Sequence, residues 1–91
     1  MEKVEKHTMS VYYSGYVKPV DAWAPIVYMF ENLGFLAIPR YESIAVSLEI
    51  RKHIIEVKAP VEALRAVKIR ITDMKIFEFP WLIEIRIDEE S

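Results

Sequence analysis

The apolar residues of this chain change their spacing along the sequence, and this change limits the folds that it can adopt. Between residues 60 and 78 they recur every three or four positions, at Leu64, Val67, Ile71, Met74 and Phe77. That spacing places them on one side of an α-helix. Pro60 suits the first turn of such a helix, and Pro80 ends it. The spacing therefore predicts a helix over 60–78 with a sustained apolar face.

Other stretches have an apolar residue at every second position, which is the period of a β-strand. The first runs from Met9 to about Val17, and the last covers residues 81–87. Between them, residues 43–50 and 53–58 alternate in two runs that two basic residues separate. We expect these two runs to pair as a β-hairpin.

A shorter helix is predicted between the first strand and the hairpin. Asp21 is a suitable N-cap, and Gly34 suits the position just after a helix that ends near Leu33. Pro25 falls in or near the first turn, where its missing N–H costs least. Residues 35–42 then form a connector. The apolar face of this helix carries Val20, Trp23, Val27 and Phe30.

The predicted elements follow one another in the order β-α-β-β-α-β. This order indicates an α+β fold, with a small antiparallel sheet and two helices on one face. A helix through 44–54 is the alternative to the hairpin, although an apolar spacing of two fits a helix poorly. A chain of 91 residues makes one domain. We expect residues 1–8 to form a flexible arm and residues 88–91 an acidic tail.

The proportion of apolar residues points to a partner chain. Hydrophobic residues make up 53% of the sequence, above the roughly 45–50% usual in soluble domains. A chain this short has a high ratio of surface to volume and cannot bury all of that apolar surface within itself. Several large aromatic residues are of the kinds enriched at interface cores: Tyr12, Tyr13, Tyr16, Trp23, Tyr28 and Trp81. We therefore expect an oligomer.

The residues that catalysis usually requires are scarce. The chain has no cysteine, so disulfides and thiolate metal sites are excluded, and its two glycines cannot build a phosphate-binding loop. His7 and His53 are far apart in sequence, with no third ligand at helical spacing, and we expect both to be exposed and without chemistry. We predict no cofactor, no metal and no enzymatic activity.

Charge and hydropathy indicate which partners and which cellular compartment the sequence favours. The formal net charge of −2 gives no overall attraction to nucleic acid. The longest uncharged run, residues 22–30, is too short to cross a bilayer, and the charged start has no signal-peptide character, so we expect the cytoplasm. Glutamine is absent and asparagine occurs once, a bias typical of thermophile proteins.

Several short segments resemble the Pcc-type subunits of the KEOPS tRNA-modification complex, the CTAG/Pcc family. Ala63-Leu64-Arg65 matches the Ala-Leu-Arg of the family's second helix, and Val27-Tyr28 matches a pair common in the first helix of archaeal members. Residues 54–59 resemble the Ile/Val-rich strand that ends in alanine. Residues 66–70 depart from the usual Gly, Thr or Ser, Val, Asn-Ser, and the strand after Pro80 is an addition. The chain is therefore most similar to a divergent accessory paralog. Three connector residues also match the family: Pro39, Arg40 and Ser43.

The resemblance implies a non-catalytic scaffold. Pcc-type subunits dimerise through their sheets, and their helices pack on the catalytic subunit, which attaches threonylcarbamoyl to an adenosine of tRNA. On this basis the helices would contact the catalytic subunit through Trp23, Val27, Phe30, Leu64, Arg65, Lys68, Ile71 and Met74. The dimer, with itself or with a Pcc-type paralog, would form through Ile44, Val46, Leu48 and Ile50. A weak tRNA contact would come from the basic hairpin tip, Arg51, Lys52 and His53.

A second resemblance gives an alternative function. Val17-Lys18-Pro19-Val20 ahead of a helix is similar to the Lys-Pro-Val of Alba-type chromatin proteins, which are small nucleic-acid-binding dimers. Residues 38–43 stand where that family has a basic, glycine-containing segment. The pI of about 5.7 also weighs against binding driven by phosphate contacts.

Overall fold

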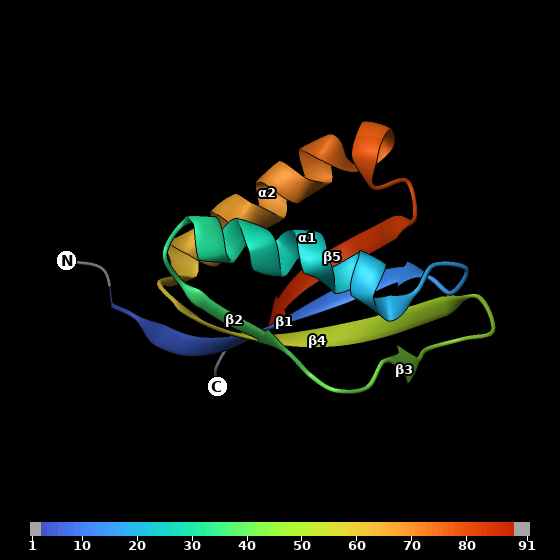
Figure 1. Ribbon diagram of the computed structural model, residues 1–91, viewed down its shortest axis with the longest axis horizontal. Helices are drawn as coiled ribbons and strands as arrows, with labels where there is room; N and C mark the ends of the chain where they lie inside the picture. The colour runs from blue at the N-terminus through green and yellow to red at the C-terminus, as the bar shows by residue number, and fades with distance from the viewer. Residues whose placement is uncertain (1–2, 89–91) are drawn as a thin grey trace.

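An antiparallel sheet with two helices on one face makes up the structure, a computed structural model that describes residues 3–88 (Figure 1). The strands lie in the order β2-β4-β1-β5, and the very short β3 also pairs with β4. The predicted α+β architecture is confirmed. The elements are β1 (Glu5–Ser14), α1 (Pro19–Asn32), β2 (Leu36–Pro39), β3 (Ile44–Ala45), β4 (Ile50–Ala59), α2 (Val61–Glu78) and β5 (Leu82–Asp88).

The two central strands organise the core. β1 and β4 pair along their whole length, from Glu5 opposite Ala59 to Ser14 opposite Ile50. Every second residue from His7 to Tyr13 in β1 and from His53 to Ala59 in β4 faces the helices and is buried, as the period of a strand requires. Met9, Val11 and Tyr13 of β1 are fully buried, as are Ile55, Val57 and Ala59 of β4. The helices complete this core with Ala22, Ile26, Val27, Phe30, Leu64, Val67 and Ile71.

The first helix begins earlier than the sequence predicted. Lys18 is the N-cap and Pro19 the first helical residue, so the N-cap prediction for Asp21 is wrong. Proline has a φ already suited to the first helical position, which explains the earlier start. Pro25 therefore lies in the second turn, and the carbonyl of Asp21 lacks the N–H that residue 25 would otherwise donate.

Gly34 follows the end of α1 as predicted, and its backbone has a φ of +87°. We expect Gly34→Ala to lower the free energy of unfolding by about 1 kcal/mol, because a Cβ is unfavourable in the left-handed region. Gly15→Ala is the matched control, since an added Cβ there meets its nearest atoms at an ordinary 3.6 Å. Urea unfolding monitored by circular dichroism measures both changes. Equal losses of stability in the two variants would contradict a left-handed backbone at Gly34.

The predicted hairpin of residues 43–50 with 53–58 is wrong in its first strand. Residues 44–45 alone form β3, and the chain then turns. Ser47 makes that turn, because its Oγ accepts hydrogen bonds from the backbone N–H groups of Glu49 at 3.3 Å and Ile50 at 3.2 Å. The main partner of β4 on this side is β2, which lies in the segment predicted to be a connector.

The N-terminal arm is also shorter than predicted. β1 begins at Glu5, and residues 5–8 pair with residues 56–59 of β4. The arm prediction is therefore wrong for these four residues, because β4 is long enough to give each a partner. The strand ends at Ser14 rather than near Val17. Of the predicted acidic tail, Asp88 belongs to β5, and residues 89–91 lie outside the described residues.

The second half of the fold follows the sequence closely. α2 runs from Val61 to Glu78, within one residue of the predicted helix, and β5 is shifted by one residue from the predicted strand 81–87. β5 pairs with β1 in antiparallel fashion, with an irregularity in register between Tyr12 and Tyr13. The C-terminal end of α2 lies farther from the sheet than its start (Figure 1).

Candidate functional site

A groove of about 720 Å³ runs between the two helices, on the side away from the sheet. Its walls are mostly apolar, with one arginine and one aspartate towards the α2 side. α1 contributes Pro25, Tyr28, Met29, Asn32 and Leu33, and α2 contributes Ala66, Val67, Ile69, Arg70 and Asp73. A concave apolar surface with a few polar groups is the usual form of a binding site.

The groove exposes side chains that a soluble monomer usually buries. Tyr28 is 67% exposed, Leu33 53% and Ile69 61%. α1 turns Ile26, Val27 and Phe30 into the core, so an apolar residue such as Tyr28 is left on its outer side. Gathered apolar exposure of this kind marks interaction surfaces, whereas single exposed residues are ordinary.

The apolar surface continues along α2 beyond the groove. Ile76 and Phe77 are 79% and 88% exposed, and they follow Ile69 by seven and eight positions. Residues seven or eight apart share one side of a helix. Phe77 belongs to the predicted apolar stripe but is exposed, because the C-terminal end of α2 lies farther from the sheet than its start.

Four of the residues predicted to contact the catalytic subunit are core residues instead. Val27, Phe30, Leu64 and Ile71 are buried. The stripes that the sequence shows are the faces that cover the sheet, so these residues are not available to a partner. The others remain at least partly accessible: Trp23, Lys68 and Met74 are half-buried and Arg65 is exposed. Of the groove residues, Tyr28 was among the aromatic residues expected at an interface, whereas Leu33 and Ile69 were not predicted as partner contacts.

The residues predicted to form the dimer do not share a strand. Ile44 lies in β3, Val46 and Leu48 lie in the turn that follows, and Ile50 begins β4. The alternating strand face on which this prediction depended is therefore absent. Leu48 is fully exposed at the turn, and Ile44 and Val46 are about half exposed.

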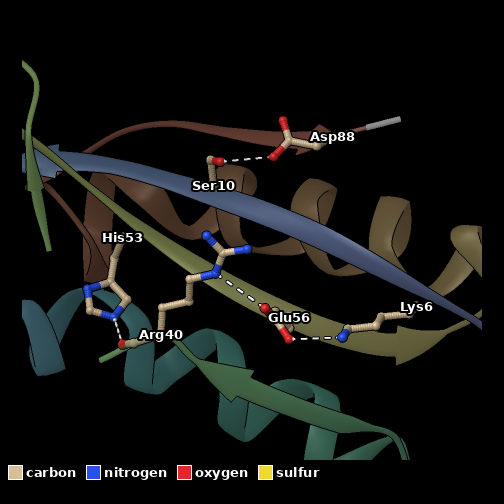
Figure 2. Close-up of polar contacts among 6 residues, drawn as sticks. All are labelled: Lys6, Ser10, Arg40, His53, Glu56 and Asp88. Atoms are coloured by element: carbon tan, nitrogen blue, oxygen red, sulfur yellow. Dashed lines mark hydrogen bonds and ion pairs between the residues drawn. The ribbon is translucent and has the colours of Figure 1, made fainter. Parts of the chain in front are cut away.

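The basic triad lies within β4 rather than at a hairpin tip, so its predicted placement is wrong. His53 is 1% exposed, and its Nε2 lies 2.7 Å from the backbone oxygen of Arg40 (Figure 2). Arg51 donates from Nε to the Oγ of Ser43 at 2.8 Å. Lys52 lies 5.8 Å from the ring centre of Tyr12. His53 is therefore corrected from an RNA contact to a buried residue, because its side chain faces the helices.

His7 is also buried, at 7% exposed, so the prediction of two exposed histidines is wrong. Both lie on the helix-facing side of the central strands, where alternate positions enter the core. Among residues 3–88, no group of three or more histidine, aspartate or glutamate side chains could hold a metal ion. Over the same residues, no helix has the length and hydrophobicity that crossing a bilayer requires.

The helix-free face of the sheet carries mixed charges. Glu56 pairs with Lys6 at 3.4 Å and with Arg40 at 3.3 Å (Figure 2). The hydrogen bond from Lys6, then its charge and the contribution of Arg40, lowers the pKa of Glu56, so this carboxylate is charged at neutral pH. Ser10 donates a hydrogen bond to Asp88 at 3.3 Å, which links β1 to β5. Beside these charges the face also exposes Leu36 and Ile38 of β2, which lie opposite Lys58 and Glu56.

Comparison with known proteins gives no relative: no protein-family model, no curated protein and no solved structure matches the chain.

Proposed function

We propose that this protein is a non-catalytic subunit of the KEOPS complex that supports threonylcarbamoyl-adenosine modification of tRNA in the cytoplasm. It dimerises through its sheet, with itself or with a Pcc-type paralog, and its helices dock on the catalytic subunit. The observation that carries this proposal is the apolar groove between α1 and α2, with Tyr28, Leu33 and Ile69 exposed along it.

The positions of the Pcc-like segments support the proposal. In Val27-Tyr28, the valine is buried in the core and the tyrosine lines the groove. In Ala63-Leu64-Arg65, the leucine is buried and the arginine is exposed. Ala59 is the last residue of β4. A scaffold that binds through a helical face needs this combination of buried and accessible residues.

The occupant of the groove that we propose is an apolar helical face of the catalytic subunit. Two side-by-side helices leave a trough into which the ridge of a third helix packs, which is a common mode of recognition. Arg70 and Asp73 lie among the lining residues of α2 and offer one charge of each sign to the partner. The nucleic-acid-binding alternative gains less support, since His53 is buried and Arg51 is bound to Ser43.

Ile69→Asp tests this proposal. We expect the variant to fold normally, because Ile69 is 61% exposed, and to lose binding to the catalytic subunit by about tenfold or more. Placing a carboxylate against an apolar helix costs its desolvation without a compensating partner. The measurement is co-purification with the catalytic subunit and the main Pcc-type subunit, followed by titration.

Thr72→Asp is the matched control, because Thr72 is exposed on the same helix and is not among the groove residues. It introduces the same charge and should leave binding unchanged. Equal binding by both variants would exclude the groove as the docking site. A wild-type chain that binds neither KEOPS subunit would refute the proposed function itself.

A further inference from the structure

β5 has one free edge. It pairs with β1 on one side, and no strand among residues 3–88 pairs with its other side. At the opposite edge of the sheet, β2 has only four residues, including Pro39. β5 has seven residues and no proline. Long free edges recruit further strands, whereas short edges that contain proline do not. β5 is therefore the edge that can accept another strand, along the part from Glu84 to Asp88 that pairs regularly with β1; Ile83 lies at the irregularity in register.

The charges on β5 are arranged symmetrically about Ile85. Glu84 and Arg86 are half exposed, and their side chains lie 3.1 Å apart, from Arg86 Nε to Glu84 Oε2. Both project from the helix-free face, where they lie opposite Tyr12 and Ser10 of β1. An identical strand running antiparallel, with Ile85 opposite Ile85, would place each Glu84 opposite Arg86 of the second copy. Opposite charges directly across a ladder are stabilising.

Neighbouring registers lack this match. A shift that centres the pairing on Glu84 places the two glutamates opposite each other, and one centred on Arg86 does the same for the arginines. Like charges in these positions are destabilising. A shift that places Glu84 opposite Ile85 would put its carboxylate on the apolar face of the sheet. The order of charges therefore favours the register centred on Ile85.

We propose that the second copy of this chain binds at the β5 edge, so that two sheets join into one continuous antiparallel sheet centred on Ile85. This inference deepens the dimer part of the proposed function and rests on it. The pairing would cover Ile83, which is 43% exposed. Lys75 donates to the Ile83 carbonyl at 3.4 Å, a long and exposed hydrogen bond that a neighbouring strand can replace. The groove between the helices stays free for the catalytic subunit.

Charge reversal tests the proposed register. In Glu84→Arg, two arginines face two arginines across the dimer, and in Arg86→Glu the four residues are all glutamates. For each variant alone, we expect a dimer dissociation constant about tenfold or more above that of the wild type. An equimolar mixture should restore the dimer, because each strand then faces the opposite charge. Sedimentation velocity measures the three samples, and circular dichroism checks that each variant is folded.

The mixture separates this inference from a loss of the pair within one chain. Both single variants lose their internal Glu84–Arg86 pair, and mixing does not restore it. A monomeric wild type, single variants that dimerise normally, or a mixture without heterodimer would each overturn the proposed interface. If Leu48→Asp lost the dimer and the two charge variants kept it, the dimer interface would lie instead at the segment of Ile44, Val46 and Leu48. None of these results affects binding at the groove, which the Ile69→Asp experiment measures separately.

Discussion

Replacement of Ile71 by aspartate is expected to abolish folding. Ile71 is 1% exposed on the side of α2 that packs against the sheet, within the same core cluster as Leu64 and Val67. The substitution loses about 2–5 kcal/mol of apolar packing and also places a carboxylate in a site without a partner. A domain of this size has a stability of only about 5–15 kcal/mol. Circular dichroism and thermal unfolding should therefore show no cooperative transition.

Ile69→Asp is the control for this prediction, because it introduces the same charge two positions away on the same helix. Ile69 is exposed, so the variant should unfold with nearly the wild-type midpoint. Ile71→Val should be intermediate, with a loss of about 0.5–1.5 kcal/mol. A cooperative transition retained in Ile71→Asp would mean that this side of α2 is a partner interface rather than core.

Phe30→Ala should cause the second largest loss, about 3–5 kcal/mol in the free energy of unfolding. Phe30 is fully buried in the last turns of α1 and belongs to the main core cluster. Removing its ring leaves a cavity that the surrounding strands and helices fill only in part. Urea unfolding measures this loss. The urea concentration at the midpoint should fall while the slope of the unfolding free energy against urea stays constant.

The matched control is Tyr28→Ala, two residues earlier on α1. Tyr28 is 67% exposed at the groove, so its removal should change stability by less than about 0.5 kcal/mol. Under the proposed function it should instead weaken binding to the catalytic subunit. If Phe30→Ala were the milder of the two for stability, the assignment of the two sides of α1 would be reversed.

The two helices show that the apolar period predicts where a helix lies but not what its apolar face contacts. The spacing in the sequence located α2 to within one residue at its start, because an apolar stripe and two prolines mark it. It could not say whether the stripe served the core or a partner. That depends on whether a sheet lies beneath the helix, and the sheet places Leu64, Val67 and Ile71 in the core while Phe77 is left exposed.

The segment before β4 shows where local pattern fails. Residues 44–50 alternate as a strand does, yet only residues 44–45 pair with β4. Ser47 makes local hydrogen bonds that turn the chain, and β2 occupies the edge of β4 from Ile55 to Lys58. β2 itself has little alternation to reveal it. Competition between segments for one strand edge is a property of the whole chain, and no window of sequence contains it.

Sequence alone was enough to predict both helices and the strands β1, β4 and β5, because the period of apolar residues follows from the geometry of a helix or a strand. It also indicated an excess of apolar surface, since composition and length limit what one chain can bury. Which apolar residues are exposed depends on the tertiary structure. Burial depends on what packs against each face, so the accessible surface moved from the predicted stripes to the groove of Tyr28, Leu33 and Ile69 and to the free edge of β5.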